Sequence, residues 1–274
     1  MLGNAVVKVC SETPEHQVFG TVRAASSRRF FEPNIADKLI TGIDVLEHDS
    51  LTNAFIQARP DVVINCVGLV KQLEAADDPL QAVPINTLLP HRLAKLCEVA
   101  RARLVHISTD CVFSGEKGGY LESDNSDAED LYGKSKFLGE VAYPNSITLR
   151  TSIIGHELQN AHSLIDWFLA QNDACRGYTN AVFSGVPTVV LAHIIRDIVL
   201  PRPELFGLYH VAAEPITKYD LLKLVAKVYG KEIEIAPDDK LRIDRSLNGA
   251  RFSDAFGYST PEWEEMIKLM FTYK

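Results

Sequence analysis

The sequence contains no apolar run that approaches the roughly 20 residues required by a membrane-spanning helix. No signal-peptide pattern comes before the first predicted element. Its five cysteines are an odd number, and their spacing fits neither a disulfide framework nor a metal site. No cluster of His, Cys and carboxylate residues indicates a metal ion. These absences predict a reduced, soluble, cytoplasmic protein with no membrane partner and no bound metal.

An excess of positive charge is also lacking, since 28 basic residues face 36 acidic ones and the net charge is −8. A broad nucleic-acid-binding surface is therefore not expected. Apolar residues, by contrast, make up 46% of the 274 residues, which is enough to bury one large core or two modest ones.

The most informative stretch runs from residue 104 to residue 140. A short β-type run, Leu104–Ile107, leads into Ser-Thr-Asp, and a helical pattern begins with Tyr132 and Lys136. A Tyr and a Lys four residues apart on a helix lie one turn apart on the same face. A nearby ammonium group favours the phenolate, lowers the phenol pKa from about 10 and makes the phenol a usable general acid.

Thr109 stands at the predicted end of the preceding strand, where its hydroxyl can hydrogen-bond the same substrate oxygen. Together with Tyr132 and Lys136 it predicts proton transfer at a carbonyl or an alcohol. A Tyr-x-x-x-Lys pattern also arises by chance in helices, and Ser-Thr-Asp can be an ordinary strand end followed by a turn. The combination of both, in this order, is the specific signal.

This combination resembles the extended short-chain dehydrogenases/reductases, and within them the dTDP-4-dehydrorhamnose reductase group. Ser108–Gly115 and Tyr132–Glu140 match the group's patterns S-T-D-x-V-F-x-G and Y-G-x-S-K-x-x-G-E. The resemblance covers nearly the whole chain and is looser in the last third. It implies an α/β fold with a Rossmann-like doubly wound parallel sheet, the catalytic residues Thr109, Tyr132 and Lys136, and the cofactor NADP(H).

The first residues depart from that group, whose chains begin with a β-strand and a Gly-x-x-Gly-x-x-Gly turn. Only Gly3, as the third glycine, has a counterpart here. We therefore expect the first strand and half of the cradle for the cofactor pyrophosphate to be absent. The alternatives are a start assigned at an internal Met, a fragment, and a real truncation that abolishes cofactor binding.

Three predicted strands border the cofactor. The strand Gln17–Val22 ends at Arg23, and an arginine at this position accommodates the 2′-phosphate of NADP, although the segment also fits a solvated basic loop. A second short strand is predicted at Gly42–Val45, and the resemblance places Asp44 and Val45 beside the adenine. The apolar strand Pro60–Val67 is followed by a glycine that lets the backbone approach the ribose, so that Val67 and Gly68 are cofactor-binding candidates. The resemblance also counts Tyr132 and Lys136 among the cofactor-binding residues, since Lys136 is expected to hold the ribose.

The resemblance also assigns residues to the substrate. Those expected to border the sugar are Val70, Lys71, Cys111, Val112 and Phe113. The segment Lys240–Arg251 carries four basic residues against one acid, and is a candidate seat for a diphosphate through Arg245 and Asn248. An exposed charged loop is the alternative for that segment.

The rest of the chain alternates apolar strand-like and helical runs, as βαβ units do. Helices are predicted at 49–58, 84–100, 163–171, 188–200 and 218–229, a strand at 146–150, and loop with a short strand at 178–188. Asn86 either supports the active site or is a capping amide, and Trp263 is expected to pack in the core. We predict an NADP-binding domain at 1–152, rejoined by a strand near 207–211, and a small substrate domain at 153–274.

The expected function is NADPH-dependent reduction of a nucleotide-linked 4-keto-6-deoxy sugar, in deoxysugar and cell-surface polysaccharide biosynthesis. An epimerase or dehydratase of the same fold is the first alternative, against which Arg23 and the Cys111 that follows Asp110 both argue. A non-catalytic, nucleotide-binding regulatory subunit is the second, favoured by the missing strand. The expected partner is a nucleotide sugar, and the sequence leaves a homodimer open.

Overall fold

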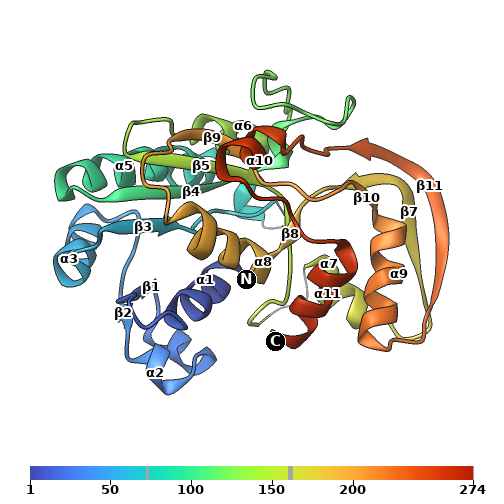
Figure 1. Cartoon of the computed structure of the whole chain (residues 1–274), viewed down its shortest axis with the longest axis horizontal. Coiled ribbons are helices and arrows are strands. Elements are labelled where there is room, and N and C mark those ends of the chain that lie inside the picture. Colours follow the sequence, from blue (N-terminus) through green and yellow to red (C-terminus); the bar gives the residue numbers. More distant parts are fainter. Residues whose placement is uncertain (72–73, 160–162, 274) are drawn as a thin grey trace.

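Figure 1 shows the computed structural model of the chain, which describes residues 1–71, 74–159 and 163–273. Four strands form the main sheet in the order β3-β4-β5-β9. Every pairing is parallel, so the carboxyl ends of the strands meet at one edge. The strands are β3 (Val62–Asn65), β4 (Arg103–Thr109), β5 (Ser146–Thr151) and β9 (Gly207–His210). The predicted α/β, Rossmann-like sheet is confirmed, and the last strand rejoins it beside β5 as expected.

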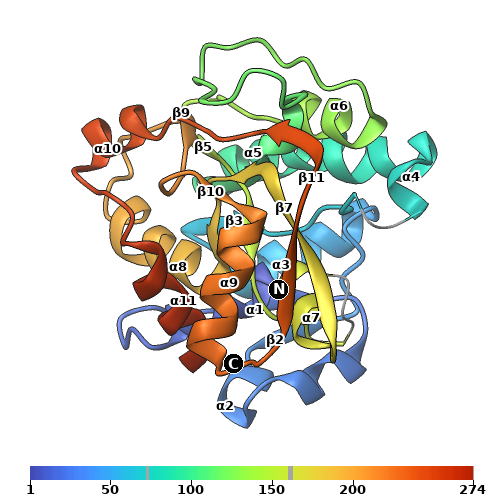
Figure 2. The same ribbon diagram turned by 90° about the vertical axis from the view of Figure 1, so that its right-hand side faces the viewer.

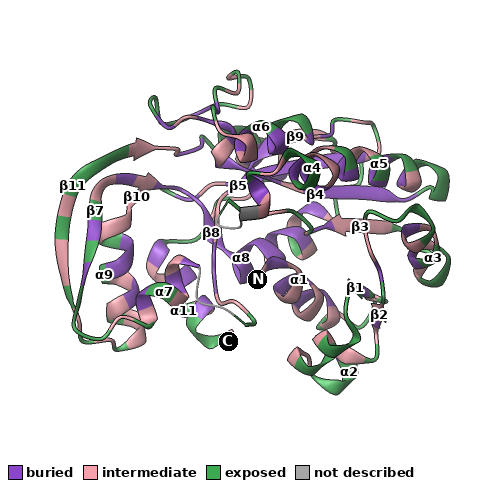
Figure 3. Ribbon diagram, turned by 180° about the vertical axis from the view of Figure 1, so that it is seen from behind, coloured by how far each residue is buried: buried purple, intermediate pink, exposed green. Residues whose placement is uncertain are grey.

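Helices cover both faces of this sheet, and consecutive residues of β4 point to opposite faces. Leu104 packs into one apolar cluster with Leu51 and Leu93, whereas Val105 packs into the larger cluster with Val6 and Leu191. The first face is therefore covered by α3 and α5, and the second by α1 and α8. Their bounds are α1 (Leu2–Ser11), α3 (His48–Ala58), α5 (Leu89–Ala100) and α8 (Thr188–His193). Figure 3 shows β4 and α8 mostly buried, α1 with both buried and intermediate residues, and α3 with an exposed outer side.

A separate two-stranded parallel sheet precedes the main one, and consists of β1 (Gly20–Val22) and β2 (Leu39–Thr41). Within the described ranges no strand joins β1 to β3. The prediction of a strand at 42–45 is wrong. Gly42 has a φ of +78°, which turns the chain away directly after β2. Between the strands lie η1 (Ala25–Phe30) and α2 (Pro33–Ala36).

The helix predicted at 84–100 begins earlier and is not uniform. It runs without interruption through α4 (Pro79–Ala82), a π-helical segment η3 (Val83–Leu88) and α5. The side chain of Asp78 caps its start by accepting a hydrogen bond from the Leu80 amide. Such π-helical turns are frequent at functional sites, and this one contains Asn86.

The C-terminal part adds a second, mostly extended layer (Figure 2). Its sheet has the order β10-β7-β11, with β7 antiparallel to β10 and parallel to β11, and α9 packs against β7. The strands and helix are β7 (Ala174–Phe183), β10 (Ile216–Thr217), α9 (Lys218–Tyr229) and β11 (Glu234–Asp244). Two predictions are wrong here. Residues 178–183, part of the segment 178–188 predicted as loop with a short strand, belong to the long strand β7, and residues 240–244 are strand rather than loop.

The remaining elements connect these layers, and a two-residue parallel pair, β6 with β8, links them at the centre. They are η2 (Glu74–Ala76), η4 (Asp110–Val112), α6 (Leu131–Leu138), β6 (Ile153–Ile154), α7 (Leu164–Leu169), β8 (Val186–Pro187), η5 (Ile194–Val199), α10 (Ala250–Phe256) and α11 (Trp263–Thr272). Trp263 is buried and its indole N–H donates to the Glu214 carbonyl oxygen at 2.7 Å, which confirms its packing role.

The largest apolar cluster contains residues from both sides of the predicted domain boundary near residue 152. Val6 and Ile147 of the first part share it with Phe168, Leu221 and Ile267 of the second. The two predicted domains therefore share one core. No helix in the described part of the chain is both long and apolar enough to span a bilayer.

Candidate active site

The strand edge that carries the predicted catalytic threonine is held by a short turn. Thr109 is the last residue of β4, and its hydroxyl accepts a hydrogen bond from the Cys111 amide and donates to the Asp110 carboxylate, both at 3.1 Å. This caps η4, which directs residues 110–112 away from the strand. The Asp110 carboxyl is buried, and burial raises its pKa.

Helix α6 presents Tyr132 and Lys136 to this edge. Asp130 is its N-cap and accepts a hydrogen bond from the Gly133 amide at 2.8 Å. Gly133 is required because a Cβ there would lie 2.3 Å from the Cys111 carbonyl oxygen, so the helix sits directly against η4. The sequence motif thus places Tyr132 beside Thr109 and Cys111, and both of these residues act on the ionisation of its phenol.

The ionisation of Tyr132 differs from the expectation. Burial raises the pKa of the phenol above its ordinary value, the Cys111 thiol and the Asp110 carboxyl add to the increase, and the Thr109 hydroxyl acts against it. The expected lowering of this pKa by a neighbouring ammonium is not found in this structure, where burial is the largest cause of the shift. Tyr132 is therefore a neutral phenol with a proton to give.

Lys136 is buried, and its ammonium group donates to the Ile107 carbonyl oxygen at 2.8 Å. Burial lowers the pKa of this lysine to about 8, and the Glu140 carboxylate acts in the opposite direction. A Cβ on Gly68 would lie 3.8 Å from Nζ, so the backbone after β3 passes next to the ammonium group. Lys136 thus lies between two neighbouring strand ends.

Asn86 connects two of these segments by hydrogen bonds, so it supports the candidate site rather than acting as a capping amide. The buried amide accepts from the Leu69 backbone N–H at 2.9 Å and donates to Ser135 Oγ at 3.1 Å. It thereby fixes the segment after Gly68 to α6. The close contact of α6 with η3 depends on Gly139, where a Cβ would lie 1.9 Å from the Asn86 carbonyl oxygen.

The residues predicted for the cofactor lie in different surroundings. Arg23 and Asp44 follow β1 and β2 and form an exposed ion pair, with 3.7 Å between Nε and Oδ2. Gly3 is in the first turn of α1, next to Asn4, whose buried Oδ1 has no partner among the described residues. Val67 is exposed, whereas Val45 packs against the apolar cluster beneath α3.

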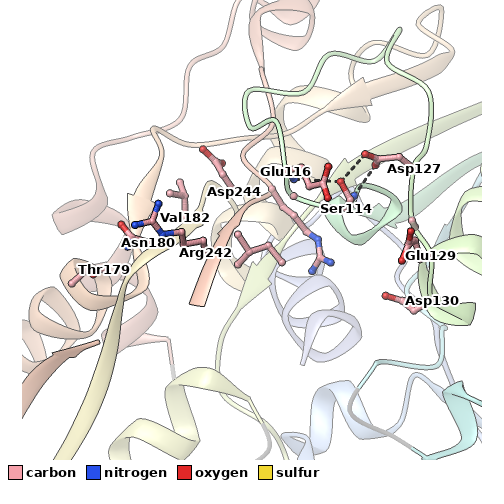
Figure 4. Close-up of a pocket in the computed structure, with 14 residues that line it drawn as sticks. Ser114, Glu116, Asp127, Glu129, Asp130, Thr179, Asn180, Val182, Arg242 and Asp244 are labelled. Carbon is pink, nitrogen blue, oxygen red and sulfur yellow. Dashed lines mark hydrogen bonds between the residues drawn. The ribbon is translucent and has the colours of Figure 1, made fainter. Parts of the chain in front are cut away.

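A pocket of about 1030 Å³ opens between the loop before α6 and the strands β7 and β11 (Figure 4). Asp130, the N-cap of α6, lines it, whereas Thr109, Tyr132 and Lys136 do not. Arg245 lines it, donating from Nε to the Phe113 carbonyl oxygen at 2.7 Å and from Nη1 to Cys111 Sγ at 3.7 Å. Lys71 reaches its edge, where its ammonium group lies 2.7 Å from Asp130 Oδ2. Lys71, Cys111 and Arg245, predicted separately, thus gather around the start of α6.

Other substrate candidates lie elsewhere. The side chains of Val112 and Phe113 are fully buried in a small apolar cluster with Tyr120 and Leu247. Val70 is exposed. Asn248 does not line the pocket of Arg245 but a second pocket of about 390 Å³, which borders His210.

The charge of the larger pocket also differs from that of the Lys240–Arg251 segment taken alone. Arg242 and Arg245 are its two basic residues. Carboxylates contributed by the facing loop and by β11 outnumber them: Glu116, Asp127, Glu129, Asp130 and Asp244. Of these, Asp127 accepts two hydrogen bonds from Ser114, as Figure 4 shows. The described residues contain no group of three or more His, Cys, Asp and Glu that could hold a metal ion.

Sequence comparison identifies the family of this arrangement, since the model of the RmlD substrate binding domain matches residues 1–273. The chain belongs to that family. Among curated RmlD-like relatives, the dTDP-4-dehydrorhamnose reductase of Salmonella typhimurium is 30% identical over 240 residues, covering 78% of this chain and 80% of the relative. That of Aggregatibacter actinomycetemcomitans is 27% identical over 256 residues, covering 84% and 87%. The resemblance to the dTDP-4-dehydrorhamnose reductase group is confirmed.

Solved structures agree in fold with this RmlD-type chain. A hypothetical dTDP-4-dehydrorhamnose reductase from Sulfolobus tokodaii superposes with a TM-score of 0.77 at 24% identity, covering 96% of this chain and 94% of the other. The dTDP-4-dehydrorhamnose reductase from Bacillus anthracis in complex with NADP gives a TM-score of 0.74 at 18% identity, covering 94% and 100%. At these identities the likeness concerns the fold.

Proposed function

We propose that the protein is an NADPH-dependent reductase of a nucleotide-linked 4-keto-6-deoxy sugar, serving deoxysugar and cell-surface polysaccharide biosynthesis. The observation that carries the proposal is the convergence of Thr109, Tyr132 and Lys136 at the carboxyl edge of a parallel sheet, where open α/β folds bind ligands. The curated relatives named dTDP-4-dehydrorhamnose reductase support it. The cytoplasm as compartment and a homodimer as assembly remain predictions, as does the division into domains at residue 152.

The groups of this chain can bind most parts of a dinucleotide cofactor. The first turn of α1 offers free backbone N–H groups beside Gly3, which suits a pyrophosphate. Lys136 and the Gly68 backbone would hold the nicotinamide ribose, and Arg23 with Asp44 the adenosine. NADPH, when bound, supplies the hydride for the carbonyl carbon.

The chain's own residues handle the proton. Tyr132 holds its proton firmly, because burial raises its pKa. It gives up that proton only when the substrate oxygen becomes strongly basic, as it does on accepting hydride at the adjacent carbon. Thr109 hydrogen-bonds the same oxygen and orients it, once its hydroxyl turns from Asp110. The Lys136 ammonium favours the resulting phenolate.

The deciding experiment measures NADPH binding and then its oxidation with a panel of nucleotide-linked 4-keto-6-deoxy sugars. We expect loss of the reduced cofactor's absorbance with at least one of these sugars and a deoxysugar product with a new alcohol. Epimerase or dehydratase activity would instead convert the sugar without net oxidation of NADPH. Binding of NADPH without turnover of any sugar would favour the non-catalytic regulatory subunit.

The pH dependence of the reaction follows from Lys136. Because burial lowers the pKa of this lysine to about 8, it loses its proton as the pH rises through that value. The raised pKa of Tyr132 places the ionisation of the phenol higher. We expect kcat/KM in the free enzyme to fall on the alkaline side with an apparent pKa near that of Lys136. A pH profile that stays flat through this region would contradict the assignment.

The choice between NADPH and NADH depends on Arg23. Its guanidinium is exposed and paired only loosely with Asp44, so it is free to meet a 2′-phosphate. We expect Arg23→Ala to raise the KM for NADPH by about 10–100-fold, the loss of one charge-assisted contact, and to leave the KM for NADH unchanged. Arg202→Ala, at another exposed arginine, is the matched control. An equal increase in the KM for NADPH and for NADH would show that Arg23 does not recognise the 2′-phosphate.

A further inference from the structure

A buried ion pair lies directly behind the catalytic strand edge. Glu140, which follows α6, accepts hydrogen bonds from Arg150 on β5, at 2.8 Å from Nε and 2.6 Å from Nη2. The side chains are 10% and 1% exposed, so both charges are withdrawn from water. Such a pair is costly to bury and costly to break. Neither residue is among the predicted catalytic residues.

The pair reaches Thr109 through its neighbour in the chain. Ser108 Oγ donates to Glu140 Oε1 at 2.6 Å. Consecutive residues of a strand point to opposite faces, so Ser108 faces the ion pair while Thr109 faces the other way. A hydrogen bond that fixes the Ser108 side chain therefore fixes the rotation of the strand end, and with it the direction of the Thr109 hydroxyl.

Arg150 is held on its other side as well. Its Nη1 donates to His210 Nε2 at 2.9 Å, and its guanidinium lies 4.9 Å from the centre of the Phe113 ring. Since arginine can only donate, the His210 proton is on Nδ1, which donates to the Tyr120 carbonyl oxygen at 3.1 Å. Burial, helped by the charge of Arg150, lowers the pKa of His210 to about 3, so this histidine is neutral. Arg150 therefore has Glu140 as its counter-charge.

Glu140 also acts on Lys136. Among the described residues, Glu140 and His106 on β4 interact electrostatically with this lysine, and Tyr132 lies one turn before it on the same helix. Burial keeps His106 neutral by lowering its pKa well below the ordinary value. Two further neighbours, the Ile107 carbonyl and the Gly68 backbone, carry no net charge. Glu140 is thus the negative charge that helps this buried lysine keep its proton.

We propose that Glu140 is a positioning residue for the reduction, acting on Thr109 through Ser108 and on Lys136 through its charge, with Arg150 holding its carboxylate in place. The proposal rests on the proposed function. The competing interpretation is an ion pair that stabilises the fold and does nothing for the reaction.

The main test is Glu140→Gln. With the carboxylate gone and Arg150 still charged, we expect the alkaline limb of the kcat/KM profile to move to lower pH by about one unit. Glu140→Asp keeps the charge and should restore the limb. The matched control is Arg103→Met, which removes a buried arginine at the other end of β4 whose guanidinium donates to the Val199 and Leu205 carbonyls. Arg103→Met should lower stability without moving the alkaline limb of the kcat/KM profile. If the limb did not move in Glu140→Gln either, the proposal would be overturned.

A second variant keeps the proposal testable if Glu140→Gln does not fold. Ser108→Ala removes one hydrogen bond and leaves the ion pair intact. We expect kcat to fall about tenfold, through misdirection of Thr109, with the KM for NADPH unchanged. A wild-type kcat in this variant would refute the link from Glu140 to Thr109.

A third measurement needs no turnover. Carbon-13 NMR of labelled lysine side chains follows the titration of Lys136 in the free protein, with Lys136→Met used to assign the signal. We expect the midpoint near pH 8 in the wild type, as burial predicts, and a lower one in Glu140→Gln. If the wild type reduces no keto sugar, the proposed function fails, yet this titration still decides whether Glu140 acts on Lys136. An identical midpoint in both proteins would show that it does not.

Discussion

Tyr132→Phe should lower the kcat of sugar reduction by about 10²–10⁴-fold, the usual contribution of a general acid. The substitution removes one oxygen from a half-buried side chain and leaves the ring, α6 and the Asp130 cap in place. The thermal midpoint and the affinity for NADPH should therefore stay close to those of the wild type. The measurements are steady-state kinetics, cofactor binding and thermal unfolding of the same preparations.

The matched control for this variant is Tyr273→Phe. The Tyr273 hydroxyl donates to the Glu12 carboxylate at 2.8 Å, beside the C-terminus of α1, and takes no part in the proposed site. This control should retain full activity. If Tyr132→Phe were equally active, the proton would have to come from another group, and the proposed reaction scheme would be wrong.

Gly139→Ala should be among the most damaging single-methyl additions in the chain. A Cβ there would lie 1.9 Å from the Asn86 carbonyl oxygen and 3.0 Å from the carbonyl carbon, and backbone atoms cannot rotate aside. Helix α6 must move away from η3, which also disturbs the contacts of Asn86 with Leu69 and Ser135. We expect a loss of about 3 kcal/mol in the free energy of unfolding, a thermal midpoint lower by roughly 5–10 °C, and reduced kcat.

Gly249→Ala is a close control for that experiment. Gly139 has φ −90° and ψ −2°, and Gly249 has φ −92° and ψ 7°, so the backbone cost of alanine is nearly the same at both. At Gly249, however, the nearest atom to a Cβ is the Ala212 carbonyl oxygen at an ordinary 3.5 Å. A similar loss of stability in the two variants would mean that the α6–η3 contact is not the cause.

The sequence predicted those parts of the site that depend on local patterns. Thr109, Tyr132 and Lys136 lie where a strand end and one helix face place them, because strand alternation and helical spacing are local rules. The ionisation of Tyr132 was not predictable in this way. Its pKa depends on how deeply the phenol is buried, which is set by η4 and by residues that are distant in the sequence.

Long-range contacts explain the other differences. Arg245 and Asn248 are three residues apart and line different pockets, because Leu247 between them is buried and bridges to Tyr120. The sequence pattern did not predict the full length of strand β7, because polar residues lie on its exposed side. Its pairing with β10 and β11 defines it in the structure. The Glu140–Arg150 pair likewise forms when the chain returns through β5, so neither residue alone predicts the contact.

The three-residue strands β1 and β2 have consequences for local unfolding. Two-stranded sheets of this length are marginal by themselves, and in the described chain β1 gains no hydrogen bonds from the main sheet. Amide hydrogens in residues 20–22 and 39–41 should therefore exchange with solvent well before those of β4 and β5. The adenosine end of the cofactor would then meet the least protected part of the molecule, and its binding should slow exchange there most.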